Sequence, residues 1–314
     1  MLNKGYLGTW TAGLLVSAAV GMFAACSSDP AGGGVTPTNP ADSGLPNDSG
    51  SSTDKDSGKG PDAGPSPEGG TPSAKTGFVT LIYYDTATAH SLFGSAGFSD
   101  QASANAPTCT KTTEGACVVE DCVKPAAVDA GPTPVEPTAG VIAITGGTIP
   151  AGLKLTPNAA GVYSPSSIPM SQAWLGATDI TFTAAGAGVP AFTKMLKSPA
   201  TLTLTSPHVT TWDSSTSRDI TWSGTGLNSV VLTLSKSSTT NLVLATCTFA
   251  ASALTGSVPA AALVKLKGSV FYEVAHEDSS AITPGGYDVK VLIRSFLREA
   301  ASTNGLATGS ITVN

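Results

Sequence analysis

The three histidines of the chain, His90, His208 and His276, are the first side chains to examine for chemistry, because imidazole serves both as a general base and as a metal ligand. His276 precedes Glu277 and Asp278, yet the second histidine of an H-E-x-x-H zinc motif is absent. A metal site at His276 would need Asp278 and a distant histidine. We therefore predict no metal site. We place His276 at a strand end beside a polar loop, where it stays a candidate ligand-binding residue.

The sequence carries no local signature of an enzyme. Serine is abundant, but there is no G-x-S-x-G nucleophile elbow and no G-x-x-x-x-G-K-[ST] phosphate loop. A Ser-His-Asp set or a pair of carboxylates can still assemble from distant parts of a chain, because such sets are defined by geometry. We therefore predict neither catalytic residues nor a cofactor, and we keep a surface hydrolase as the alternative to a binding module.

Four cysteines follow the N-terminal segment, at Cys109, Cys117, Cys122 and Cys247. An even number of cysteines in an exported chain predicts two disulfides, and four cysteines allow three pairings. A hairpin around residues 113–115 would place Cys109 opposite Cys117, which leaves Cys122 for Cys247. The spacings fit no common zinc finger or ribbon, so disulfides are the favoured interpretation.

Tryptophan rings can stack on sugars, and Trp174, Trp212 and Trp222 are the candidates in this chain. Trp222 alternates with Ile220 along one strand, which predicts a place in the core. Trp212 comes just before the polar loop 213–217, which predicts an exposed ring. We therefore name Trp212, with His276, as a weak candidate for ligand binding.

Short strands must position these residues. Apolar side chains recur at every second position in many segments, which is typical of half-buried strands. The clearest runs are Phe78–Tyr84, Ile180–Phe182, Ile220–Trp222, Val230–Leu234, Val243–Phe249, Tyr287–Ile293 and Ile311–Val313. About ten such strands predict an all-β body over residues 78–314, an antiparallel β-sandwich or jelly-roll-like fold. A boundary near residue 199 would give two smaller sandwiches, but we favour one body. Residues 260–267 predict a short helix that ends at Gly268.

The composition excludes a nucleic-acid binder. The chain has 16 Lys and Arg against 22 Asp and Glu, for a formal net charge of −6, and its basic residues are scattered. Binding to phosphates requires clustered basic side chains.

Residues 27–77 predict a disordered tether between the N-terminal segment and the body. The segment has only two large aliphatic residues, Val35 and Leu45, among Ser, Gly, Pro, Asp and Thr. Such a composition buries too little apolar surface to offset the entropy of ordering.

Residues 1–25 have the composition of an export signal. Lys4 provides a positive charge, and apolar and small residues run from Leu7 to Ala25. The sequence Phe23-Ala24-Ala25-Cys26 resembles the lipobox of bacterial lipoproteins. The resemblance implies a diacylglycerol thioether on Cys26 and cleavage before it, which makes the lipidated cysteine the mature N-terminus. Phe23 stands where that family usually has leucine.

Two other interpretations of this segment stay open, an uncleaved transmembrane helix and an ordinary cleaved signal. Ser27, and not aspartate, follows Cys26. In Gram-negative envelopes this resembles lipoproteins that are forwarded to the outer membrane, on a face that the sequence leaves open.

Taken together, the sequence predicts a lipid-anchored protein of the cell envelope, attached to the membrane through its N-terminal lipid. We expect the body to be a non-catalytic binding or structural module with an envelope polymer or a protein as partner. The alternative is a surface hydrolase that acts on polysaccharide or peptide.

Overall fold

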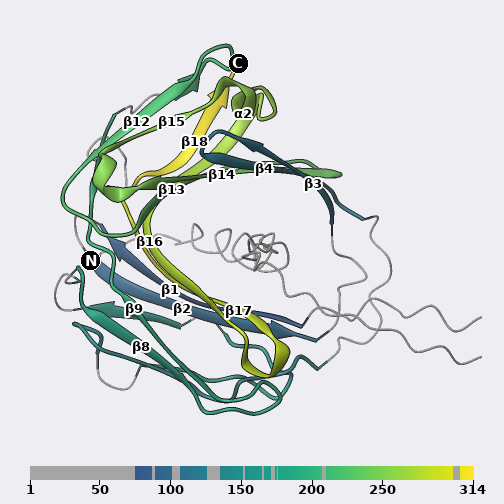
Figure 1. Cartoon of the computed structure of the whole chain (residues 1–314), viewed down its shortest axis with the longest axis vertical. Coiled ribbons are helices and arrows are strands. Elements are labelled where there is room, and N and C mark those ends of the chain that lie inside the picture. The colour runs from purple at the N-terminus through teal and green to yellow at the C-terminus, as the bar shows by residue number, and fades with distance from the viewer. Residues whose placement is uncertain are drawn as a thin grey trace, which may run out of the picture. The chain divides into compact units, whose positions relative to one another are not determined.

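The computed structural model describes residues 75–86, 89–100, 107–125, 135–150, 153–164, 166–170, 174, 176–206, 210–299 and 305–314. All of them belong to one compact unit, and most lie in strands, which confirms the predicted all-β, sandwich-like body (Figure 1). Cys26, His208 and most of the predicted tether lie outside the described residues. Within the described part of the chain, no helix is both long enough and apolar enough to cross a bilayer.

The largest sheet of the described residues has eleven strands. Nine of them follow in the order β3 (Thr108–Glu114), β4 (Cys117–Val123), β14 (Asn241–Ala250), β13 (Ser229–Ser237), β16 (Gly268–Ile282), β17 (Asp288–Phe296), β1 (Thr76–Asp85), β2 (His90–Ser99) and β7 (Ser166–Met170). In addition, β18 (Thr308–Val313) pairs with β16, and β11 (Thr211–Trp212) pairs with β18. The β1–β17 and β11–β18 pairs are parallel, so the large sheet is mixed. The prediction that all strands would be antiparallel is wrong for these two pairs.

Two smaller antiparallel sheets complete the described strands. One contains β10 (Thr203–Ser206), β12 (Arg218–Ser223) and β15 (Thr255–Val258). The other contains β6 (Lys154–Leu155), β5 (Ile142–Thr145), β8 (Asp179–Ala184) and β9 (Phe192–Lys197). Short helical segments are η2 (Ala251–Ala253), α2 (Ala260–Val264) and η3 (Pro284–Gly286), and α2 confirms the predicted short helix.

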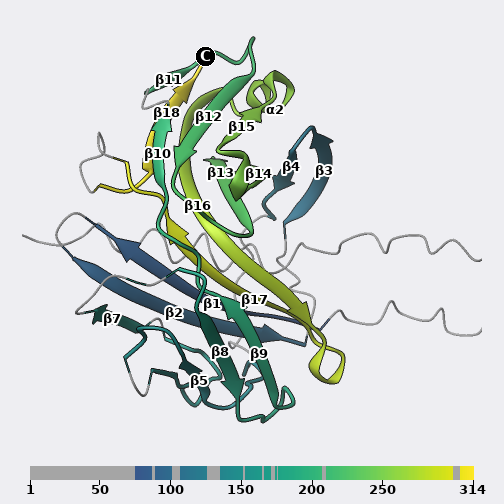
Figure 2. The same cartoon turned by 60° about the vertical axis from the view of Figure 1, so that its left-hand side comes forward.

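Each smaller sheet packs against a different part of the large one, which produces two hydrophobic cores (Figure 2). The C-terminal core joins β10, β12 and β15 to β13, β14, β18 and the first half of β16. The N-terminal core joins β5, β8 and β9 to β1, β2 and β17. β4 already contributes Cys117 and Val119 to the C-terminal core. The chain later leaves the N-terminal core after Leu196, enters the C-terminal core again at Leu202, and returns to the N-terminal core between Tyr287 and Ile293.

Strand β1 shows why its sequence is so apolar. Val79, Leu81 and Tyr83 belong to the N-terminal core, while Ile82 on the opposite face packs in a small cluster with Phe296. A strand that is covered on both faces needs apolar residues at consecutive positions, which explains the run from 78 to 84.

Glycines and phenylalanines face each other across the β1–β2 hairpin. Gly77 pairs with Phe98, and Phe78 pairs with Gly97. A Cβ atom on Gly77 would lie 2.4 Å from Phe98, and one on Gly97 would lie 2.7 Å from Phe78. Each glycine therefore leaves room for the ring on the neighbouring strand to lie across the backbone, which holds the hairpin in register.

Candidate functional site

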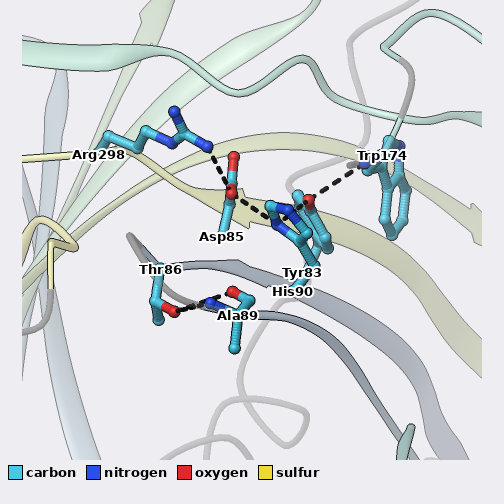
Figure 3. Close-up of polar contacts among 7 residues, drawn as sticks. All are labelled: Tyr83, Asp85, Thr86, Ala89, His90, Trp174 and Arg298. Carbon is cyan, nitrogen blue, oxygen red and sulfur yellow. Dashed lines mark hydrogen bonds and ion pairs between the residues drawn. The ribbon is translucent and has the colours of Figure 1, made fainter. Parts of the chain in front are cut away.

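A buried carboxylate at the end of the β1–β2 hairpin organises a polar cluster (Figure 3). Asp85 is the last residue of β1, and its side chain is 2% exposed. Its Oδ1 lies 2.9 Å from Nδ1 of His90 and 2.6 Å from Nη2 of Arg298. The hydroxyl of Tyr83 lies 3.2 Å from the same His90 nitrogen and accepts a hydrogen bond from the backbone N–H of Trp174 at 3.1 Å.

The hairpin register brings these groups together. Asp85 pairs directly with His90, the first residue of β2, and Tyr83 shares a face of β1 with Asp85 because side chains alternate along a strand. The turn is closed by Thr86, whose N–H donates to the carbonyl of Ala89 at 3.0 Å and whose hydroxyl both donates to that carbonyl and accepts from the Ala89 N–H. The turn therefore fixes the carboxylate and the imidazole on facing strand ends.

Charge and burial shift the pKa values of two side chains of the cluster, Arg298 and Tyr83. The hydrogen bond to Asp85 raises the pKa of Arg298, so this guanidinium is the stable counter-charge of the buried carboxylate. Burial raises the pKa of the Tyr83 phenol, although the hydrogen bond from Trp174 acts in the opposite direction. Tyr83 is therefore a neutral hydrogen-bonding group at physiological pH.

The arrangement has two chemical uses. A carboxylate beside Nδ1 favours the imidazole tautomer that carries its proton there, which leaves Nε2 of His90 as an acceptor. His90 is 28% exposed and Arg298 is 48% exposed, so both can meet a solute. In the described part of the chain, His90 has no serine or cysteine as a hydrogen-bond partner, and no three potential ligands gather around a metal position. The cluster can accept a proton or bind an acidic group.

Sequence reasoning missed this cluster. Its signal is an apolar strand that ends in an aspartate, followed five residues later by a histidine that begins another alternating strand. That spacing indicates an interacting Asp85–His90 pair only if a tight hairpin joins the two strands. The strand register of this hairpin is what brings Asp85 opposite His90.

His276 lies in the middle of β16 and is 1% exposed, so the predicted strand-end position is wrong. The strand extends to Ile282 because β17 continues to pair with it beyond the end of β13. Nδ1 of His276 lies 2.8 Å from the carbonyl oxygen of Ala200, and Nε2 contacts the carbonyl oxygen of Leu227. His276 also lines a pocket of about 530 Å³.

Trp212 is not the exposed platform that its neighbouring polar loop predicted. It is 4% exposed and belongs to the C-terminal core, because β11 pairs with β18 and places Trp212 opposite Val313. Trp222 lies in the same core, as predicted, and its indole N–H donates to the carbonyl of Ala251 at 2.9 Å. Trp212 does not line the pocket to which His276 contributes.

The four cysteines form two disulfides, Cys109–Cys122 and Cys117–Cys247. The disulfides confirm the interpretation of the cysteines, but the predicted pairing is wrong. The β3–β4 hairpin turns at residues 115 and 116, with Gly115 at a φ of +59° as its first turn residue, and not around residue 114. This register places Cys109 opposite Cys122 and leaves Cys117 opposite Cys247 on β14.

The chain matches no protein-family model, and no curated protein or solved structure matches it significantly. The strands show that this is an all-β protein. The two disulfides indicate an oxidising, non-cytoplasmic location.

Proposed function

We propose that this chain is a lipoprotein of the cell envelope whose β body is a non-catalytic binding or structural module. The observation that carries the proposal is the pair of disulfides in the body, because such bonds persist in oxidising compartments. The lipobox-like sequence that ends at Cys26 supplies the anchor, and Ser27 favours the outer membrane as its destination. Several acyl chains on one cysteine provide durable attachment, whereas a single chain does not.

Two surfaces of the body support a binding role. The first is the pocket of about 530 Å³ beside His276, a size that is ordinary for ligand sites. The second is the half-exposed guanidinium of Arg298, which Asp85 holds in place. The partner in this proposal is an envelope polymer or a protein.

A surface hydrolase acting on polysaccharide or peptide is the second candidate, and the Asp85–His90 pair favours it. A carboxylate that orients an imidazole is the arrangement by which many hydrolases hold their general base. Nε2 of His90 would then take a proton from the attacking group, and Arg298 would stabilise the negative charge that develops.

Incubating the full chain, purified in detergent, with envelope polysaccharides and peptides separates the two functions. A binding module retains a polymer and releases no product. Turnover that falls at least about a hundredfold in His90→Gln, but not in the exposed control Lys154→Gln, would establish the hydrolase instead. Protease treatment of intact cells, followed by detection of the body, then assigns the membrane face.

A further inference from the structure

The pocket beside His276 lies where the chain passes between the two hydrophobic cores. Its walls come from residues 176–177 before β8, residues 198–200 between β9 and β10, and residues 225–228 between β12 and β13. His276, on β16, touches two of these three segments through their carbonyl oxygens. Ligand sites often occur at such junctions between packed units.

The walls of this pocket are held in place by hydrogen bonds. One N–H of the His276 imidazole donates to the carbonyl of Ala200 or of Leu227, and the other ring nitrogen only contacts the second carbonyl. The N–H of Ala177 donates to the carbonyl of Ser198 at 2.7 Å, and the carbonyl of Asn228 accepts from the N–H of Ala251 at 3.0 Å. A binding loop that is already ordered loses little entropy when a ligand arrives.

Gly226 keeps the pocket in this form. A Cβ atom at this position would lie 2.8 Å from Cε1 of His276, so any larger residue would push the imidazole away from its carbonyl partners. His276 is thus a positioning residue, because both of its ring nitrogens face backbone carbonyls of the pocket walls and not the space between them.

The chemistry of the lining favours a neutral ligand with hydroxyl groups. No Asp, Glu, Lys or Arg lines the pocket, and both ring nitrogens of His276 face backbone carbonyls, so no lining side chain is placed to pair with an ionic ligand. The hydroxyl of Thr225 and the amide of Asn228 make no hydrogen bond with other described residues, and both groups donate as well as accept. Leu227, which is 59% exposed, lies between them in the sequence.

We propose that this pocket binds a neutral sugar residue of an envelope polysaccharide. A sugar ring offers alternating hydroxyl donors and acceptors for Thr225 and Asn228, and an apolar C–H face for Leu227. The inference rests on the proposed binding function and names the class of its ligand.

The test is calorimetric titration of the full chain in detergent with neutral trisaccharides (maltotriose, cellotriose and chitotriose), with trigalacturonate as an acidic comparison. At least one neutral trisaccharide binds, and trigalacturonate binds more weakly. Thr225→Val and Asn228→Gly each weaken the binding about 3- to 10-fold, the loss expected for one hydrogen bond. Glycine tolerates the positive φ of 68° at residue 228, so this variant keeps the loop conformation. Thr216→Val, an exposed threonine outside the pocket, is the matched control and leaves the affinity unchanged.

Three results would overturn the inference: no binding of any neutral trisaccharide up to millimolar concentration, equal loss in the control, or tighter binding of trigalacturonate. If Arg298→Met abolished the binding of trigalacturonate, this acidic ligand would bind at the Asp85 cluster and not in the pocket. Acylation of Cys26, measured on the same preparation, keeps the proposals apart. An acylated protein without sugar binding contradicts only this inference, whereas a sugar-binding protein without acyl chains contradicts only the anchor.

Discussion

Replacing both cysteines of the Cys117–Cys247 disulfide by alanine should destabilise the body more than the same change at Cys109 and Cys122. In the chain-entropy description, a disulfide stabilises the fold by restricting the unfolded chain, and the effect grows with the loop that it closes. The two bonds join residues 130 and 13 positions apart. These separations correspond to about 5 kcal/mol for Cys117–Cys247 and about 3 kcal/mol for Cys109–Cys122.

Burial acts in the same direction as loop length. Cys117 and Cys247 are both fully buried in the C-terminal core, whereas Cys109 lies half-buried on the edge strand β3. Removing two sulfur atoms from the core also leaves a small void, which adds to the loss.

Guanidinium denaturation of the full chain, followed by circular dichroism, measures the free energy of unfolding for each double variant. The expected difference between the two variants is about 2 kcal/mol, since a tenfold longer loop changes the entropy term by that amount. An equal loss, or a larger loss for the Cys109/Cys122 variant, would show that loop length and burial do not set the contribution of each disulfide.

Three further predictions concern ionisable side chains. Arg294→Met leaves the carboxylates of Glu273 and Glu277 without their buried partner and should lower the free energy of unfolding by about 3 to 5 kcal/mol. The triple variant Arg294→Met/Glu273→Gln/Glu277→Gln should lose less free energy of unfolding, because no buried charge is left unpaired. Equal losses in the two variants would argue against a charge effect. Burial, with a contribution from the Glu273 carboxylate, raises the pKa of Tyr84 to about 12, so its contribution to stability is complete below pH 10 and is lost as the pH rises through 12. Alkaline denaturation of Tyr84→Phe should therefore show a flatter pH dependence than the unchanged protein, and an identical profile would contradict this. Asp85→Asn removes the charge that pairs with Arg298 and orients His90, and it should lower the free energy of unfolding by about 1 to 3 kcal/mol in a thermal unfolding assay. An unchanged free energy of unfolding would be the contrary result.

The alternation of apolar residues predicted the core strands well. Val230, Leu232 and Leu234 were expected on one inward face, and all three are fully buried in the C-terminal core. The short helix after Pro259 also follows from local signals, since proline opens it and Gly268, with a φ of +111°, follows its end. Such features depend on neighbours in the sequence, so the sequence alone is enough to find them.

Features that depend on pairing between distant segments could not be predicted in this way. The parallel pairing of β1 with β17 joins residues more than 200 positions apart, and no local pattern encodes it. Trp212 looked exposed because a polar loop follows it, but its pairing with β18 buries the ring. The disulfide pairing was wrong for a smaller reason, because a shift in the position of one turn changes which cysteines face each other.

The candidate sites depend on register in the same way. Asp85 meets His90 only because a tight hairpin brings their strand ends together, and His276 meets the loop before β13 because it pairs with Val230 at the start of that strand. Single residues of the right type were visible in the sequence, but their partners come from the fold.

Mass spectrometry of the mature protein, isolated from the membranes of its own cells, decides whether the chain is a lipoprotein. We expect an N-terminal peptide that begins at Cys26 and carries the mass of a diacylglycerol thioether. A chain that keeps residues 1–25, or one that begins elsewhere with an unmodified Cys26, would contradict the envelope lipoprotein proposed here.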